Sequence, residues 1–361
     1  ASAVENLSCQ RLRRRQPAPR TGLIMPINRQ VVLASYVTDA AQPENFALSE
    51  GPMPEPGEGE FLLRNMYFSM EPAIRGWVDG KANYFEPIPI GGVIRGPSVG
   101  QVIKSNNPDF AEGEYVYALN QWEDYSLCHS DAILLEKLKP EAGIPLSYYV
   151  GSLGGAGATA YIGLREVGLI QAGQTVVVSA AAGATGSMAG QIARLCGCKV
   201  IGIVGSDDKA ELIVEQFGFD AAINYKTEDV AAAVMSLAPE GVDIYFDNVG
   251  GPVLNAMLKT MTVYGRIVAC GMISDYNRTD NPNPITNLWE MVSRQLTMQG
   301  FLLPTYQEKV PEAMAQLEEW IRAGDITVLE NITEGFVNTP KAFCELMSGK
   351  TVGKALVRVD F

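Results

Sequence analysis

The first part of the chain alternates short apolar and aromatic runs with clusters of proline and glycine. Between residues 31 and 125 these runs are VVLASYV, FLLRNMYFSM, SVGQVIKS and GEYVYAL, and the segment GPMPEPGEGE separates the first two. β-Branched and aromatic residues favour strands, whereas clustered proline and glycine favour turns. The pattern therefore predicts an irregular, mostly antiparallel β domain.

The rhythm changes after about residue 151, where apolar strands alternate with helical stretches. The expected strands are TVVVSA, KVIGIV, AAINY, VDIYFDNV and GRIVACG, and the expected helices span about 187–196, 209–217 and 253–261. Such alternation builds right-handed βαβ units around a parallel sheet. An amphipathic helix over 310–323 follows, and then a final strand, KALVRV. That strand needs another sheet to join, so we expect it to return to the first domain.

The predicted fold class is α/β, with a β-rich domain and a doubly wound parallel-sheet domain of the Rossmann type. We assign residues 25–148 and 326–361 to the first domain and residues 149–325 to the second. Residues 1–24 differ from both domains, because they contain five arginines against one glutamate and lack the apolar centre of a secretory signal. We expect an unstructured leader there, with an organelle transit sequence as the alternative.

Composition limits the classes of function. The 361 residues are 47% hydrophobic and 19% charged, which is typical of a globular protein. The net charge of -13 disfavours a nucleic-acid partner, because lysine and arginine supply most of the affinity for phosphates. No apolar run reaches the roughly 18 to 20 residues that cross a bilayer. The six cysteines are dispersed, which indicates reduced thiols and a cytoplasmic protein.

The strand TVVVSA leads directly into a glycine turn and a helix, which is the order of a dinucleotide-binding fingerprint. The turn contains Ala181, Gly183 and Gly186, with alanine where the fingerprint usually has its first glycine. Gly183 would let the backbone approach a pyrophosphate, and Gly186 would let the helix pack closely on the strand. The helix N-terminus would receive the negative charge. A tight βα turn without a ligand is the alternative.

The end of the next strand indicates which dinucleotide binds. NAD enzymes place a carboxylate there for the ribose 2′-hydroxyl, whereas NADP enzymes place small and cationic residues around the 2′-phosphate. Gly205, Ser206 and Lys209 fit the second pattern, so we expect NADPH. Asp207 and Asp208 argue against it, unless they stabilise the start of the following helix.

The chain is poor in residues for metal or histidine chemistry. His129 is its single histidine, so neither a catalytic triad nor a multi-histidine metal site is easily built. Cys196 and Cys198 are one residue apart and lack the C-x-x-C spacing of a structural zinc site. We expect no metal. Cys270 has no base beside it in any motif, so we interpret it as a buried strand-end residue rather than a nucleophile.

Four ordered segments resemble a known family. They are SAAAGATGSMAGQIARLCGCKVIGIVGSDDK, GFDAAINYK, YFDNVGG and GRIVACGMISDYN. The chain resembles the leukotriene B4 dehydrogenase/prostaglandin reductase family of medium-chain dehydrogenases/reductases, to which curcumin reductases and 2-alkenal reductases are similar. The resemblance covers nearly the whole chain from about Arg29. It implies a GroES-like catalytic domain formed by both ends of the chain, no zinc, NADPH as cofactor and a homodimer.

The resemblance also implies a set of site residues. The pyrophosphate of NADPH would lie against Gly183, Ala184, Thr185, Gly186 and Ser187, and the 2′-phosphate against Ser206, Lys209 and Tyr225. Asn248 would contact the ribose region. The nicotinamide end would be flanked by Cys270, Gly271, Ser274, Tyr276, Phe301 and Leu303.

Three segments depart from the family pattern. The family's D-P-Y-M-R is here the run from Glu71 to Arg75, with Ala73 in place of the tyrosine. Its M-P-G is here 155–157, which reads GAG. Thr351 stands where the family has an asparagine that contacts the cofactor. The first two departures would reshape the substrate pocket, and the third changes a cofactor contact.

The implied reaction is NADPH-dependent reduction of the C=C double bond of an α,β-unsaturated aldehyde or ketone, such as an alkenal, an alkenone, a curcumin-like diketone or an oxo-prostanoid. Hydride transfer to the β-carbon leaves negative charge on the carbonyl oxygen, so a hydrogen-bond donor to that oxygen stabilises the transition state. Tyr276 is the candidate donor, and Tyr84 is a candidate pocket residue. A zeta-crystallin-like NADPH quinone oxidoreductase and a catalytically silent NADPH-binding protein are the alternatives.

Overall fold

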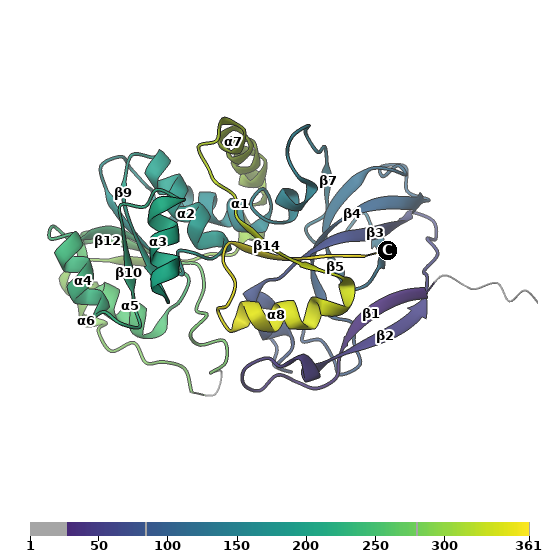
Figure 1. The fold of residues 1–361 in the computed structure, drawn as a ribbon, viewed down its shortest axis with the longest axis horizontal. Helices are drawn as coiled ribbons and strands as arrows, with labels where there is room; N and C mark the ends of the chain where they lie inside the picture. Colours follow the sequence, from purple (N-terminus) through teal and green to yellow (C-terminus); the bar gives the residue numbers. More distant parts are fainter. Residues whose placement is uncertain (1–26, 84, 279–280, 361) are drawn as a thin grey trace, which may run out of the picture.

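The computed structural model describes residues 27–83, 85–278 and 281–360. It shows two domains of different architecture side by side, with the parallel-sheet domain on the left of Figure 1 and the β-rich domain on the right. The predicted fold class is confirmed. The leader predicted over 1–24 and the candidate pocket residue Tyr84 lie outside the described residues.

Six parallel strands form the sheet of the second domain. They are β8 (Thr175–Ser179), β9 (Lys199–Val204), β10 (Ala221–Asn224), β11 (Val242–Asp247), β12 (Met261–Ala269) and β13 (Thr297–Gly300). Their order in space is β10-β9-β8-β11-β12-β13. This is the order of a dinucleotide-binding fold, in which ligands bind beyond the carboxyl ends of the strands where the order reverses. Here that point lies between β8 and β11.

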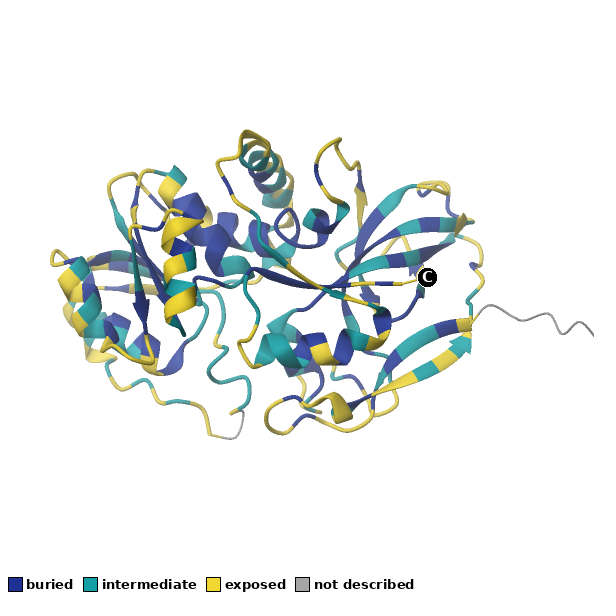
Figure 2. Cartoon of the chain, in the orientation of Figure 1, coloured by how far each residue is buried: buried dark blue, intermediate teal, exposed yellow. Residues whose placement is uncertain are grey.

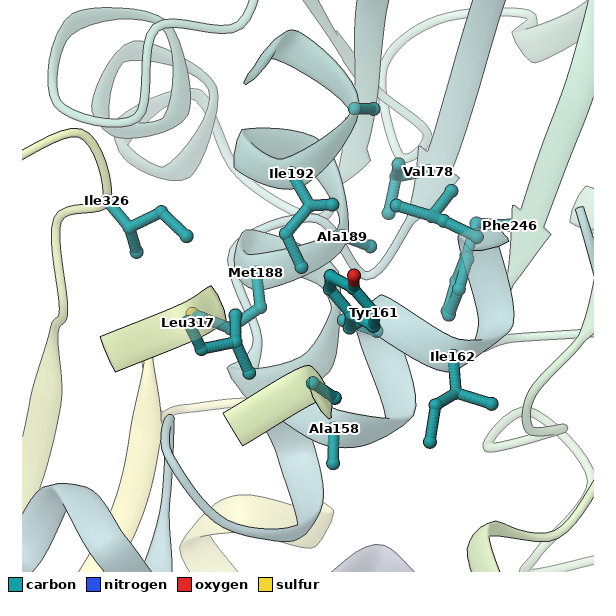
Figure 3. Close-up of a cluster of buried hydrophobic side chains, with 14 of the residues drawn as sticks. Ala158, Tyr161, Ile162, Val178, Met188, Ala189, Ile192, Phe246, Leu317 and Ile326 are labelled. Carbon is teal, nitrogen blue, oxygen red and sulfur yellow. The ribbon is translucent and has the colours of Figure 1, made fainter. Parts of the chain in front are cut away.

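The two faces of this sheet pack on different helices, because successive side chains of a strand point to opposite faces. Val176 and Val178 lie in one apolar cluster and Val177 in another. Figure 3 shows the first cluster, in which Val178 and Phe246 lie near side chains of α1, α2 and α7. The helices of the domain are α1 (Gly155–Ile162), α2 (Ala184–Leu195), α3 (Asp207–Glu215), α4 (Val230–Leu237), α5 (Gly251–Leu258), α6 (Trp289–Ser293) and α7 (Val310–Ala323), with shorter turns η4 (Gly163–Val167) and η5 (Leu303–Lys309).

The β-rich domain is built from both ends of the described chain. A seven-stranded sheet has the order β14-β15-β3-β4-β5-β7, with β6 also paired to β3, and β1 and β2 form a separate hairpin. β15 pairs antiparallel with β3, so the final strand lies in the sheet of the N-terminal strands. Figure 2 shows that the strands of both sheets carry many of the buried residues. The exact domain limits at 148 and 325 stay a prediction.

The β-rich domain contains the following strands and helical elements. The strands are β1 (Ile27–Leu33), β2 (Phe46–Pro52), β3 (Glu60–Ser69), β4 (Arg95–Ser105), β5 (Tyr115–Gln121), β6 (Tyr125–His129), β7 (Glu136–Leu138), β14 (Glu330–Glu334) and β15 (Lys354–Arg358). The helical turns are η1 (Pro43–Asn45), η2 (Pro72–Trp77), η3 (Leu146–Val150) and η6 (Phe336–Asn338), and α8 (Thr339–Met347) is an α-helix. In the described part of the chain, none of the helices combines the length and apolarity needed to span a membrane.

Three helices begin two or three residues earlier than the hydrophobic pattern predicts. α2 begins at Ala184, α3 at Asp207 and α5 at Gly251. α2 and α5 begin directly after a glycine, Gly183 and Gly250, with no side-chain cap. In α3 the Ser206 hydroxyl accepts a hydrogen bond from the Lys209 backbone N–H, which fixes the start before the first buried residue. The prediction did not include α1, α4, α6 and α8, nor the strands β2, β6, β7, β13 and β14.

Candidate functional site

The turn between β8 and α2 has the geometry of an anion site. No side chain caps the N-terminus of α2, so the N–H groups of its first turn keep their capacity for a ligand. A Cβ on Gly186 would overlap the carbonyl oxygen of Ala180, so only glycine lets the helix approach the turn this closely. Ala180 itself has a φ of 49°, in the left-handed region that favours glycine. The left-handed residue of this turn is thus Ala180, one position before the fingerprint alanine Ala181.

A segment of the other domain crosses this turn. The Gly353 N–H donates to the Ala182 carbonyl at 2.8 Å, and Gly353 forms a parallel bridge with Gly183. Gly353 has a φ of 67°, and a Cβ there would overlap the carbonyl of Leu329. Glycine is therefore required for this crossing, which brings 349–353 to the candidate pyrophosphate site.

Beside the turn, a basic cluster lies at the ends of β9 and β10. We define it as Ser206, Lys209, Tyr225 and Lys226. Lys226 lies with its ammonium 6.0 Å from the centre of the Tyr225 ring, and a Cβ on Gly205 would come within 3.1 Å of that ring. Burial, followed by the charge of Lys226, lowers the pKa of Lys209. An anion in this cluster would relieve the repulsion between the two lysines.

Lys209 also contacts the crossing segment. Its Nζ donates to the carbonyl of Gly349 at 2.8 Å and to that of Thr351 at 3.0 Å. The structure thus brings Thr351 to the basic cluster through its backbone. Lys226 was not among the predicted site residues, although it directly follows the predicted Tyr225.

One of the two acidic residues that argued against NADPH has a hydrogen-bond partner, and both lie at the start of a helix. Asp207 Oδ1 accepts a hydrogen bond from Asn224 Nδ2 at 2.7 Å. Asp207 and Asp208 both lie in the first turn of α3, where negative charge is stabilised by the helix dipole. At least one of the two carboxylates is therefore engaged within the protein.

Asn248 bridges the two strands between which the strand order reverses. Its Nδ2 donates to the Ser179 carbonyl at 2.8 Å, and its backbone N–H donates to Ser179 Oγ at 2.9 Å. Ser179 ends β8, and Asn248 directly follows β11. These bonds hold the turn after β11, and the contact of Asn248 with the cofactor ribose region stays a prediction.

Asp247 organises the backbone next to Asn248, and sequence analysis did not single it out. The side chain is buried, and its Oδ1 accepts hydrogen bonds from the Tyr245 hydroxyl and from the N–H groups of Val249 and Gly250. Burial raises the pKa of Asp247, and these hydrogen bonds oppose the rise. A polar residue at the end of the apolar strand YFD was the available indication.

The segment after β12 carries the predicted nicotinamide-end residues. The N–H groups of Cys270 and Gly271 donate to the Asp247 carbonyl at 2.9 Å and 3.0 Å. The Tyr276 hydroxyl lies 3.2 Å from the position that a Cβ on Gly271 would take. Ser274 Oγ donates to the Val249 carbonyl at 2.7 Å. The structure therefore gathers these residues, with the Tyr276 phenol, at the carboxyl ends of β11 and β12.

Phe301 and Leu303 follow β13 on the same side of the sheet. Both side chains pack against the main apolar cluster, and the Phe301 ring meets the Tyr306 ring edge-on at 6.2 Å. A Cβ on Gly163 would lie 2.9 Å from the Phe301 ring. Because the side chains face the protein, the backbone of this segment is the part available to a cofactor.

Potential metal ligands are not clustered in the described residues, where no group of three or more His, Cys, Asp or Glu side chains could hold an ion. His129 is exposed at the end of β6, with its Nδ1 3.4 Å from Asp131. The absence of a metal stays a prediction.

Comparisons with known proteins identify the family. Residues 29–135 match the family model described as the N-terminal domain of oxidoreductase, and residues 184–319 match the one described as zinc-binding dehydrogenase. The NADPH-dependent curcumin reductase of Escherichia coli is 37% identical over 92% of this chain and 97% of its own length. The chain belongs to the medium-chain dehydrogenase/reductase superfamily.

Other members of this superfamily are equally similar. The 2-alkenal reductase (NADP(+)-dependent) of Nicotiana tabacum is 38% identical over 92% of this chain and 98% of its own. Among solved structures, CurA from Vibrio vulnificus in complex with NADPH has a TM-score of 0.87 and 38% identity, covering 92% of this chain and 99% of that chain. The similarity thus extends through both domains.

Cys270 directly follows β12 and is partly buried rather than fully buried as predicted, and in this medium-chain reductase we expect its thiol to be inert. Burial, with the charges of Asp247 and Glu71, raises the pKa of Cys270 to about 12. Only the thiolate reacts, so its alkylation at pH 8 should be about a thousandfold slower than that of glutathione. Because the pKa lies above the tested range, the rate should keep rising about tenfold per pH unit from pH 7 to pH 9. Mass spectrometry of iodoacetamide labelling checks this, and a plateau in that range would reveal a stable thiolate.

Proposed function

We propose that this chain is an NADPH-dependent reductase of the C=C double bond of α,β-unsaturated aldehydes and ketones. The observation that carries the proposal is the meeting of three features at one edge of the parallel sheet: an uncapped helix N-terminus, the basic cluster and the Tyr276 phenol. The names of the relatives, curcumin reductase and 2-alkenal reductase, support an enone or enal as substrate.

The residues present fit NADPH. The first turn of α2, from Ala184 to Ser187, would hold the pyrophosphate, and the basic cluster would hold the 2′-phosphate. Asn248 would contact the ribose region. When bound, NADPH supplies the hydride that the β-carbon of the substrate accepts.

Tyr276 would stabilise the charge that develops on the substrate. A phenol hydroxyl is a hydrogen-bond donor, and a donor aimed at the carbonyl oxygen stabilises the enolate-like transition state. The α-carbon would then take its proton from solvent, so no strong general acid is required of the protein. This agrees with a site that contains no histidine among the described residues.

An NADPH-oxidation panel tests the function. The panel contains alkenals, alkenones, curcumin-like diketones, oxo-prostanoids and simple quinones, and mass spectrometry identifies the products. We expect NADPH consumption with the unsaturated carbonyls and formation of the saturated carbonyl. Turnover of quinones alone would assign the chain to quinone oxidoreductases instead. Tight NADPH binding with no turnover of any compound would indicate a silent NADPH-binding protein.

We also propose that the protein forms a homodimer through the β13 edge. This strand pairs with β12 on one side, and its other edge is not paired within the described sheet. Exposed apolar side chains occur nearby on β12 and α6, namely Val263, Tyr264, Trp289 and Val292. An open strand edge beside apolar surface favours pairing with another chain, and a second copy is the simplest partner.

The Trp289→Asp substitution should shift the dimer to monomer, because it places a charge within the exposed apolar surface at α6. Trp289 is 72% exposed, so the substitution should leave the fold intact. Light scattering coupled to size exclusion measures the mass. Ile90→Asp, at an exposed apolar residue of the other domain, is the matched control and should stay dimeric. A wild-type monomer at tens of micromolar would contradict the proposal.

A cytoplasmic location is part of the same proposal. The cysteines within the described residues, Cys128, Cys196, Cys198, Cys270 and Cys344, are all free. Free thiols are typical of proteins from reducing compartments.

A further inference from the structure

Arg75 is a buried cation in the β-rich domain that the proposed chemistry does not use. It lies in η2, the helical turn that follows β3, and its relative exposure is 0%. Burying a guanidinium is costly unless its N–H groups are bound. The partners of Arg75 therefore indicate what this cation is for.

The guanidinium joins three separate segments. Nε donates to the side-chain oxygen of Asn277 at 2.9 Å, and Nη2 donates to the Asp39 carbonyl at 3.1 Å. Nη1 lies 3.9 Å from an Asp79 carboxylate oxygen and has no hydrogen-bond partner among the described residues. Asn277 belongs to the other domain, so the bond between Arg75 and Asn277 crosses from one domain to the other.

Asn277 is the neighbour of Tyr276 in the segment after β12. On the other side of Tyr276, Ser274 Oγ holds the segment to its own domain through the Val249 carbonyl. Tyr276 thus lies between two tethers, one to each domain. An enolate-directed donor acts only if it is held in place, and a misplacement of about 1 Å can cost up to 100-fold in rate.

We propose that Arg75 is a positioning residue for Tyr276, which it holds in place across the domain boundary through Asn277. This inference rests on the proposed function, because it assigns Arg75 to the same reaction. A lysine would not replace it, since the Nε–H direction is fixed by the planar guanidinium. The bond also makes the position of the phenol depend on how the two domains meet.

Asn277 offers the sharper test, because removing the charge of Arg75 from the interior risks the fold. We expect Asn277→Ala to lower kcat for an alkenone about tenfold, with the KM for NADPH changed less than about twofold. Asn277→Asp keeps an acceptor oxygen and should retain kcat within about threefold. Asn281→Ala makes the same side-chain change at an exposed position of this segment and should behave as wild type.

Two further measurements separate positioning from general stability. In a Tyr276→Phe background, Asn277→Ala should have almost no additional effect on kcat, because the group it positions is gone. Hydrogen exchange of the amides in 271–278 should be faster in Asn277→Ala than in Asn277→Asp. An unchanged kcat in Asn277→Ala overturns the inference, and so does a full additional loss in the Tyr276→Phe background.

Failure of the proposed function gives a different result. In that case the folded wild type binds NADPH and reduces no alkenone, so the kinetic comparison has no baseline. The exchange measurement still decides the structural part of the inference: equal exchange of 271–278 in wild type and Asn277→Ala overturns it. Faster exchange in Asn277→Ala alone supports the tether.

Discussion

The Tyr276→Phe variant is expected to reduce enones with a kcat about 100-fold below that of the wild type, with little change in cofactor affinity. The substitution removes one hydroxyl and keeps the ring, so the loss measures the hydrogen bond to the developing oxyanion, commonly worth about 3 kcal/mol. The Tyr276 hydroxyl lies beside Gly271 at the carboxyl end of β12, where the reacting end of the cofactor is proposed to bind. Stopped-flow or steady-state kinetics with a single alkenone measures the effect.

Tyr36→Phe is the matched control for this variant. Tyr36 lies in the β-rich domain, outside the candidate site and the proposed dimer surface, and is 38% exposed, so this variant should leave kcat unchanged. A kcat of Tyr276→Phe equal to that of the wild type would remove the phenol from the mechanism. An increase in the KM for NADPH with kcat retained would assign Tyr276 to cofactor binding alone.

The part of the fold that the sequence predicts well is the part whose contacts are local. The strand, the turn at Gly183 and α2 follow one another in the chain, so apolar patterning and turn chemistry suffice to place them. Asp207 could likewise be interpreted as a helix-start residue from its position after Ser206. The helices α4 and α8 were missed, although Asp229 does cap α4 by accepting from the Ala232 N–H.

The contacts in the site that could not be predicted join residues far apart in the chain. Asp247 accepts a hydrogen bond from Ser179, which is 68 residues away, so this contact forms only when β8 and β11 are paired. Arg75 and Asn277 are separated by 202 positions, and no local pattern brings them together. Lys209 and Thr351 are separated by 142 positions. Tertiary folding, not local preference, sets such contacts, so a single sequence contains no direct indication of them.

The Lys209→Ala variant is expected to raise the KM for NADPH about 30-fold and to change the KM for NADH less than about threefold. Charge-assisted hydrogen bonds contribute roughly 1.5 to 3 kcal/mol, and only NADPH carries the extra phosphate. Steady-state kinetics with both cofactors measures the difference, and Lys226→Ala, which removes the other ammonium of the basic cluster, should give a smaller NADPH-selective effect.

The comparison of the two cofactors separates two roles of Lys209, binding of the 2′-phosphate and attachment of the crossing segment. In the structure its ammonium holds the Gly349 and Thr351 carbonyls, in the segment that crosses the turn at Gly183. If the lysine served only this tether, its loss would weaken NADPH and NADH equally, since both place a pyrophosphate at that turn. A selective loss of NADPH therefore assigns the charge to the 2′-phosphate, and an equal loss of both assigns it to the junction between the domains.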